Sequence, residues 1–419
     1  MSIRIPIDDI PHARKQDIIK DLQFKDEKKN KWIHPYNVVG DDIYIPFSYA
    51  VSLGFDTPSR VHYETVGIEF RGTLRDYQKE VKVQAIEMLN KKGSTLLSLH
   101  VGWGKSMFAI YLATKLRFKT LIVVNRLILI KQWTDLITHV TGSKYQILNS
   151  KSPVLINDCD FYLINATNVS KLPCGFLGAI GTVICDEIHL ICADSLYKCM
   201  FAVTPRYLIG LSATAYRPDG LDKLIGLYFG AEKILKELHK KHTVYAIHTD
   251  LKIEFKLGWD GKMDWNSVLN SQAQHPTRNQ MIVDIVRAFP DRYFLVLCKR
   301  IEQGIELLRL LEGEYVTDLL GVKKEFDEQA RIVVATGQKV GVGFSHDKLD
   351  ALILACDIEQ YFIQYLGRVF RTPDSEPIIF DLVDDLSVLK RHYATRKAVY
   401  RKAGGIIRDI NDLKTFLKN

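Results

Sequence analysis

Short apolar runs alternate with segments of helical periodicity along most of the chain after about residue 71. The first set predicts β-strands at residues 95–99, 120–124, 161–165, 182–185 and 207–211. A second set predicts strands at residues 292–298, 331–336, 349–356 and 378–383. Continuous apolar strands alternating with helices are typical of parallel sheets that are buried on both faces. The pattern therefore predicts two α/β lobes in tandem.

Different patterns flank and separate these two sets. Residues 1–70 combine a charged helical segment with a β-prone stretch at 42–46, which indicates a small accessory module. The β-prone stretch 244–255 is predicted to link the two lobes, and the turn-rich residues 257–262 are predicted to mark the boundary between them. Residues 390–419 read as helical and basic. We therefore predict an accessory module at 1–70, lobe 1 with linker at 71–257, lobe 2 at 258–395 and a basic helical tail at 396–419.

Length and composition fit this division. A chain of 419 residues is too long for one ordinary core, and 47% hydrophobic with 25% charged residues is typical of globular proteins. No apolar run is long enough to span a bilayer, and the chain starts with no signal-peptide pattern, so we expect no membrane partner. Seven cysteines without a CxxC pair favour reduced thiols in an intracellular, reducing compartment. A net charge of +8 favours a polyanionic partner, although lysine-rich surfaces are common.

A phosphate-binding loop is predicted at residues 98–106, between a strand and a helix. Gly102 and Gly104 would let backbone N–H groups approach an anion, with the helix N-terminus behind them. Lys105 would reach the β- and γ-phosphates of ATP, and the Ser106 hydroxyl would bind Mg²⁺. Taken alone, these residues fit a plain strand-to-helix turn equally well.

Two adjacent carboxylates favour the phosphate-binding interpretation. Asp186 and Glu187 follow the strand 182–185 directly, and ligands of open α/β sheets bind at this carboxyl end. Asp186 can hold Mg²⁺, and Glu187 is the natural general base for a water that attacks the γ-phosphate. The sequence thus predicts a site for ATP and Mg²⁺.

Residues 186–189, Asp-Glu-x-His, resemble motif II of the superfamily 2 helicases, and further motifs follow the family order. Residues 74–78 resemble the Q motif, and residues 121–127 together with Gln132-Trp133 resemble motif Ia. Residues 211–220 resemble motif III, residues 333–344 resemble motif V, and residues 364–371 resemble motif VI. The Arg-x-Asp-Gly extension of motif III resembles the XPB/UvsW branch, and the compact layout is similar to helicases of large DNA viruses of the poxvirus transcript-release type. The resemblance implies two tandem RecA-like parallel-sheet lobes.

The resemblance also implies roles for single residues. Gln78 would read adenine, and Gln364, Arg368 and Arg371 of motif VI would act with Glu187 in catalysis. Arg368 and Arg371 lie one helical turn apart, so we expect them on one helix face, offered across the cleft as arginine fingers. The residues expected to couple the ATP site to strand separation or translocation are His189, Ser212 and Thr214. The expected nucleic-acid contacts are Asn125, Arg126, Thr167, Thr336 and Gln338.

The resulting expectation is an ATP-dependent DNA helicase or translocase, monomeric, that binds duplex or branched DNA without sequence preference. A viral source would imply partners in replication, recombination or transcription, and a location in the host cytoplasm, the nucleus or the virion. RNA is the alternative substrate. Trp103 in the phosphate-binding loop and Ser345 in motif V depart from the family pattern, which leaves open a nucleotide-regulated clamp with weak hydrolysis. A restriction motor would need a nuclease on another subunit.

Overall fold

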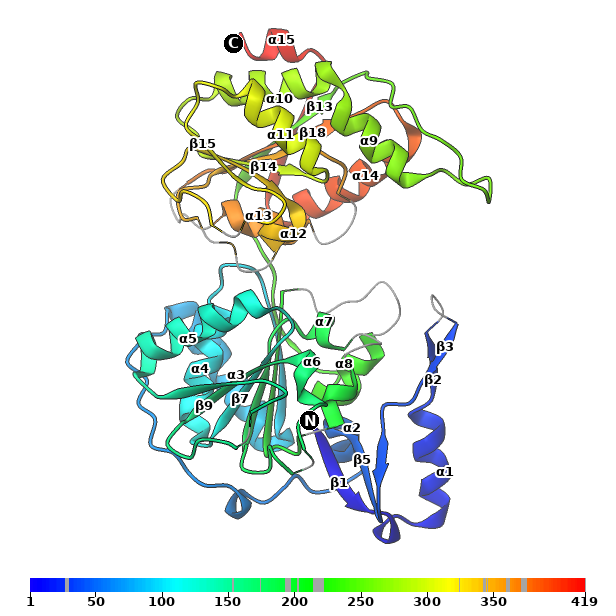
Figure 1. Cartoon of the computed structure of the whole chain (residues 1–419), viewed down its shortest axis with the longest axis vertical. Helices are drawn as coiled ribbons and strands as arrows, with labels where there is room; N and C mark the ends of the chain where they lie inside the picture. Colours follow the sequence, from blue (N-terminus) through cyan, green and yellow to red (C-terminus); the bar gives the residue numbers. More distant parts are fainter. Residues whose placement is uncertain are drawn as a thin grey trace. The chain divides into compact units, whose positions relative to one another are not determined.

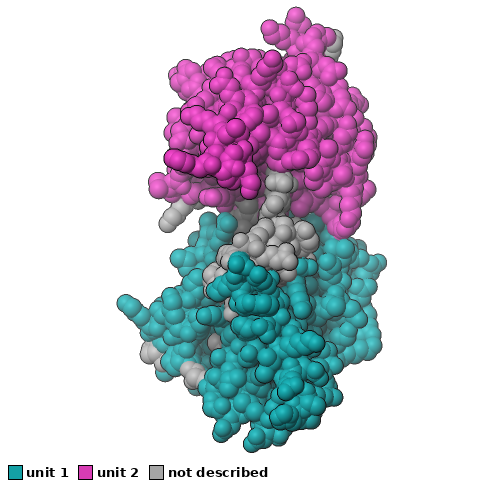
Figure 2. Space-filling model, turned by 90° about the vertical axis from the view of Figure 1, so that its right-hand side faces the viewer, with its two compact units in different colours: residues 1–236 teal, residues 237–419 magenta. Residues whose placement is uncertain are grey.

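The computed structural model describes residues 1–419 except 27–29, 153, 174, 193–196, 202, 214–221, 324, 342–343, 345, 359–361, 371–374 and 419. The chain forms two compact units, residues 1–236 and residues 237–419, which are coloured separately in Figure 2. Among the described residues, no helix is both long and apolar enough to cross a bilayer. The six described cysteines are buried free thiols, as expected.

Unit 1 holds the predicted accessory module and the first lobe (Figure 1). Its helices and strands are, in chain order, β1 (Ser2–Pro6), α1 (His12–Asp21), β2 (Phe24–Asp26), β3 (Lys31–Ile33), β4 (Asn37–Val39), β5 (Asp42–Pro46), α2 (Phe47–Ser52), α3 (Asp76–Lys92), β6 (Ser94–Leu99), α4 (Lys105–Leu116), β7 (Thr120–Val124), α5 (Leu127–Thr141), β8 (Tyr145–Leu148), β9 (Phe161–Asn165), α6 (Ala166–Val169), β10 (Thr182–Cys185), α7 (Ile188–Ile191), β11 (Tyr207–Ser212), α8 (Asp222–Phe229) and β12 (Ile234–Lys236).

The main sheet of unit 1 has seven described strands in the order β12-β6-β11-β10-β7-β9-β8, and every pairing is parallel. Its central strands are buried along their whole length, which confirms the continuous apolar pattern. The accessory module adds an antiparallel sheet, β1-β5-β4. Ile3 and Ile45 of this small sheet share one hydrophobic core with Leu121 and Val183 of the main sheet. The module is therefore part of unit 1, because its apolar face is covered by the lobe.

Unit 2 is a second α/β lobe (Figure 1). Its helices and strands are β13 (His242–His248), α9 (Trp265–Gln274), α10 (Pro276–Ala288), β14 (Phe294–Cys298), α11 (Ile301–Leu310), β15 (Val316–Leu319), β16 (Ile332–Thr336), α12 (Gly337–Gly341), β17 (Ala351–Leu354), α13 (Ile363–Val369), β18 (Ile378–Val383), α14 (Ser387–Lys402), β19 (Gly405–Ile410) and α15 (Leu413–Phe416). Its described strands form a parallel sheet in the order β15-β16-β14-β17-β18-β13-β19.

Two predicted boundaries of the second lobe differ from the structure. Most of strand β13 falls inside the predicted link at 244–255, yet the strand pairs with β18 and β19. Unit 2 therefore starts at residue 237 and not at 258. The predicted boundary at 257–262 is a hairpin inside unit 2, closed by the bridge between Leu257 and Met263. The predicted helical tail instead contains strand β19, which extends the sheet by pairing with β13. The predicted fold class, two tandem parallel-sheet lobes with a small N-terminal module, is confirmed.

Buried ion pairs stabilise the core of unit 2. Arg278 on α10 and Asp384 after β18 are both fully buried, and Nε of the arginine lies 3.0 Å from Oδ2 of the carboxylate. Arg396 on α14 donates to both oxygens of Asp381 at 2.8 Å and to Asp357 at 2.7 Å. These contacts fix the loops that follow β17 and β18 against the helices, since buried charges require paired, hydrogen-bonded partners.

Candidate functional site

The carboxyl edge of the unit 1 sheet brings the predicted residues of that lobe together. The phosphate-binding loop follows β6, Ser212 ends β11, and Asp186 with Glu187 follows β10. Asn125 and Arg126 follow β7, and Thr167 follows β9. These five strands are neighbours in the order β6-β11-β10-β7-β9 and run parallel. Residues up to about a hundred positions apart in sequence therefore meet at one edge of the sheet.

The phosphate-binding loop has the backbone geometry that an anion site needs. Gly102 and Gly104 adopt φ values of 83° and 91°, a region that favours glycine. Gly104 directly precedes α4, so Lys105 and Ser106 occupy the first helical turn, where backbone N–H groups are unpaired within the helix. Lys105 Nζ donates to the carbonyl of Leu99 at 3.1 Å, back across the loop. The loop can thus present a cation, a hydroxyl and backbone donors to a phosphate chain.

The bulk of Trp103 does not fill this loop. The side chain is 3% exposed and packs beside Tyr77 and Phe108, with ring centroids 5.5 Å and 5.2 Å away. Its carbonyl accepts hydrogen bonds from Gln78 Nε2 at 3.1 Å and from the Tyr77 hydroxyl at 3.3 Å. Trp103 therefore anchors the loop through an aromatic cluster on α3 and α4.

Gln78 is hydrogen-bonded to the backbone of the phosphate-binding loop. It is fully buried, its Oε1 accepts from the backbone N–H of Arg75 at 2.9 Å, and its Nε2 donates to Trp103. A Cβ on Gly104 would lie 2.8 Å from Gln78 Nε2, which is too close for an unperturbed contact. The structure thus shows Gln78 bonded to backbone groups, and its reading of adenine stays a prediction.

Asp186 is a buried carboxylate with both oxygens oriented. Its Oδ1 accepts from the backbone N–H of Glu187 at 2.9 Å, and its Oδ2 accepts from Trp133 Nε1 at 2.9 Å. Burial raises the pKa of Asp186 to about 6, the negative charge of Glu187 adds to this, and the Trp133 hydrogen bond and Lys105 oppose it. A nearby cation would stabilise the ionised form of this buried carboxylate.

Glu187 has a strained backbone conformation. Its φ of 48° and ψ of 54° place a residue other than glycine in the left-handed region, which costs about 1–3 kcal/mol. Among the described residues, no donor bonds to its buried Oε2, which lies 3.4 Å from Nδ1 of His189. His189 Nδ1 in turn hydrogen-bonds with Ser212 Oγ at 2.9 Å. The structure therefore brings together Glu187 and the two described coupling residues, whereas Thr214 lies outside the described residues.

The predicted nucleic-acid contacts of unit 1 lie at the same edge. Asn125 and Arg126 precede α5 and are half-buried, and Asn125 Oδ1 has no hydrogen-bond donor within the described part of the chain. Thr167 is exposed at the start of α6, where its hydroxyl donates to Asn165 Oδ1 at 2.7 Å. The three residues follow the adjacent strands β7 and β9.

The predicted residues of unit 2 lie at the carboxyl side of its own sheet. Thr336 ends β16, Gln338 lies on α12, and Gln364 and Arg368 lie on α13. Arg368 is 8% exposed, and its NH1 donates to the carbonyl of Phe344 at 2.6 Å. Helix α13 ends at Val369, and the helix face predicted to be shared by Arg368 and Arg371 stays a prediction. Arg371 itself lies outside the described residues.

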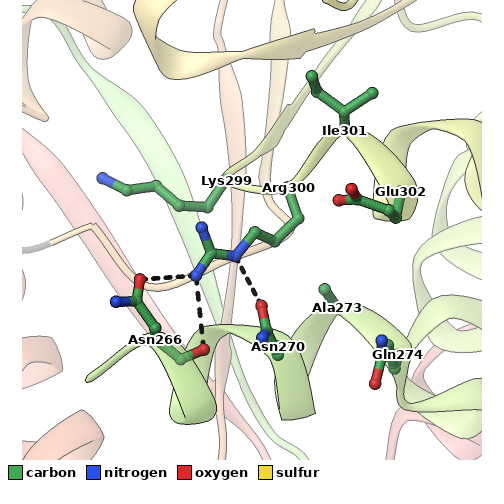
Figure 3. A pocket seen from close by; sticks show the side chains of 8 residues that line it. All are labelled: Asn266, Asn270, Ala273, Gln274, Lys299, Arg300, Ile301 and Glu302. Carbon is green, nitrogen blue, oxygen red and sulfur yellow. Dashed lines mark hydrogen bonds between the residues drawn. The ribbon is translucent and has the colours of Figure 1, made fainter. Parts of the chain in front are cut away.

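The sequence interpretation missed a polar pocket in unit 2 at the carboxyl end of β14 (Figure 3). This cavity of about 610 Å³ lies between α9 and the start of α11, and Lys299 and Arg300 line it. Arg300 is held over α9, because its Nε donates to Asn270 Oδ1 at 2.8 Å and its NH2 donates to Asn266 Oδ1 at 2.8 Å (Figure 3). Two cations directly after an apolar strand were the signal that could have indicated this site.

The residues present fit an ATP–Mg²⁺ complex. Mg²⁺ in proteins is usually held by one or two carboxylates together with substrate phosphates and water. Asp186 provides one such carboxylate, Ser106 a hydroxyl, and Glu187 has a buried oxygen that no described donor occupies. Bound Mg²⁺ would neutralise charge on the β- and γ-phosphates.

The chain is similar to viral proteins described as putative helicases. Residues 71–217 match the family model described as "Type III restriction enzyme, res subunit". The chain is 42% identical over 400 residues to "Putative helicase 161L" of Invertebrate iridescent virus 6, covering 89% of this chain and 90% of that protein. It is 32% identical over 384 residues to "Putative helicase 055L" of Frog virus 3, covering 88% of this chain and 86% of that protein.

Solved structures share the fold. Yeast (S. cerevisiae) Dbp5, solved bound to RNA and ADP BeF3, matches with a TM-score of 0.55 and 12% identity, covering 88% of this chain and 94% of that chain. At this identity the likeness concerns the fold alone. A match over 88% of this chain extends into both of its compact units.

Proposed function

Because the chain belongs to the superfamily 2 helicases, we propose that it couples ATP hydrolysis to movement along DNA or to separation of DNA strands. Membership in this family implies an ATP-hydrolysing enzyme that acts on nucleic acid. The proposal adds DNA as the substrate and assigns the chemistry to residues at the carboxyl edge of unit 1.

The conformation of Glu187 is the observation that carries the proposal. A strained backbone persists only where the surrounding structure enforces it, and here the backbone N–H of Glu187 donates to the Asp186 carboxylate that fits Mg²⁺. In this role Glu187 orients and deprotonates the attacking water. Lys105 and Ser106 bind the phosphates and the ion, and Asp186 holds the ion through its carboxylate.

Arg368 and Arg371 are proposed to contribute cations from unit 2 during hydrolysis, with Gln364 beside them. Arginine suits this role because its planar guanidinium matches phosphate oxygens and stays charged. His189, Ser212 and Thr214 are proposed to link hydrolysis to movement. Asn125, Arg126, Thr167, Thr336 and Gln338 are proposed to contact the phosphate backbone without reading sequence.

DNA is proposed over RNA because the motif III extension resembles the XPB/UvsW branch. The second candidate is an RNA substrate, which is favoured by the name of a 24%-identical relative, "Putative ATP-dependent RNA helicase L396" of Acanthamoeba polyphaga mimivirus. Phosphate release measured with duplex DNA, single-stranded DNA, branched DNA and RNA distinguishes them. We expect strong stimulation by DNA, and stimulation by RNA alone would overturn the substrate assignment.

The Glu187→Gln variant tests the catalytic assignment. We expect ATP binding to persist and hydrolysis to fall by about 10²-fold or more, since a positioned general base contributes about 10²–10⁴-fold. The matched control is Glu87→Gln, which makes the same chemical change at an exposed position on α3. Hydrolysis that is unaffected in Glu187→Gln would contradict the assignment. Absence of nucleic-acid stimulation in the unmodified protein would favour the alternative, a nucleotide-regulated clamp.

A further inference from the structure

The indole of Trp133 connects helix α5 to the carboxylate that is proposed to hold Mg²⁺. Trp133 is 2% exposed, and its Nε1 donates to Asp186 Oδ2 at 2.9 Å although the two residues are 53 positions apart. A buried indole N–H requires an acceptor, and a backbone carbonyl would be sufficient for structure alone. Here the acceptor is a buried carboxylate at the edge of the sheet.

The two hydrogen bonds of Asp186 fix the plane of its carboxylate. Oδ1 is fixed by the backbone N–H of Glu187, and Oδ2 is fixed by the indole. Each carboxylate oxygen can accept more than one hydrogen bond, so both retain lone pairs for the water shell of an ion. Partners that orient a metal-binding group in this way typically change metal affinity or activity by 10–100-fold when they are mutated.

Helix α5 directly follows two residues of the proposed nucleic-acid edge. The helix starts at Leu127, directly after Asn125 and Arg126, and Trp133 lies about two turns further along. Leu127 and Ile128 at its start are exposed, whereas Ile137 anchors the later turns in the core. A displacement at the start of this helix would move the indole, because an α-helix transmits displacement as a rigid element.

We propose that Trp133 is a positioning residue: its indole N–H orients Asp186 for magnesium–nucleotide binding and connects this site to the nucleic-acid segment at the start of α5. This inference rests on the proposed function, since it needs Asp186 to act in binding Mg²⁺. It assigns Trp133 a role that its packing alone would not require.

The test compares the full chain with Trp133→Phe, which keeps an aromatic ring and removes the N–H donor. Affinity for a fluorescent ATP analogue is measured by anisotropy in Mg²⁺ and in EDTA, each with and without single-stranded DNA. We expect the variant to lose about tenfold in affinity in Mg²⁺ and to match the unmodified protein in EDTA. We also expect the DNA-induced change in affinity to disappear in the variant.

The control variant is Ile137→Ala, which removes buried packing from the same helix and leaves the donor to Asp186 in place. It should lower the unfolding temperature and keep the Mg²⁺ dependence, and circular dichroism verifies that both variants are folded. An unchanged Mg²⁺ dependence in Trp133→Phe would overturn the inference, and a persisting DNA effect would overturn the connection through α5. If the unmodified protein shows no Mg²⁺ dependence, the proposed function itself fails.

Discussion

Nδ1 of His189 lies 2.9 Å from the hydroxyl of Ser212, and this hydrogen bond joins the segment after β10 to the end of the neighbouring strand β11. Both side chains are buried, so water does not compete for the contact. The same Nδ1 lies 3.4 Å from Glu187 Oε2. A change at the proposed catalytic carboxylate can thus reach the start of motif III through one imidazole.

Replacing His189 by Ala should separate hydrolysis from movement. We expect DNA-stimulated ATP hydrolysis to persist while strand displacement or translocation falls by about tenfold, the size of a typical coupling between sites. Ser212→Ala should give the same phenotype. The double variant should lose no more strand displacement than either single variant, because each substitution removes the same hydrogen bond. Additive losses in strand displacement would contradict a role for this hydrogen bond.

Gly104→Ala should disable the phosphate-binding loop. The new Cβ would be strained at a φ of 91° and would lie 2.8 Å from Gln78 Nε2. We expect affinity for ATP to fall by about tenfold, since the left-handed conformation alone costs about 1–2 kcal/mol for other residues. The control is Gly226→Ala on α8, where a Cβ meets no heavy atom within 4 Å and φ is ordinary. Equal ATP affinities in the two variants would exclude this explanation.

Arg396→Ala should destabilise unit 2. The guanidinium is 3% exposed and bonds to Asp381 and Asp357, so its loss leaves two buried carboxylates without their cation. We expect a loss of about 3–5 kcal/mol in the free energy of unfolding, measured with urea. Arg391→Ala removes an exposed arginine from the same helix and should change stability by less than about 0.5 kcal/mol.

Acidification should destabilise unit 2 through His242. Burial lowers the pKa of this imidazole below its ordinary value of 6.5, and the neighbouring His239 adds to the effect. The unfolded chain therefore binds a proton near pH 6.5 before the folded chain does, so stability is lost as the pH falls through 6.5. His242→Gln should reduce this slope by at most about 1.4 kcal/mol per pH unit. Urea unfolding at pH 7.5 and 6.0 measures the difference, and an unchanged slope would contradict this origin.

Much of the fold could be predicted from local pattern. Strands β7, β9, β10 and β18 have the predicted bounds because their largely apolar runs are buried along their whole length. Strand β19 was predicted as helix, since its residues alternate in exposure at a sheet edge and follow the basic helix α14. Strand β13 was predicted as a linker, because only its pairing partners, more than a hundred residues later, identify it as part of the sheet.

The sequence by itself determined which chemical groups follow each strand, because a strand, a glycine-bearing turn and a charged pair are local features. Only the tertiary structure decided how these groups face one another. It packed Trp103 against Phe108, bonded the Gln78 amide to the backbone of the phosphate-binding loop and directed the Trp133 indole to Asp186. The hydrogen bonds of Gln78 and Trp133 join residues 25 and 53 positions apart, so they depend on how neighbouring strands and helices pack, which no local pattern encodes.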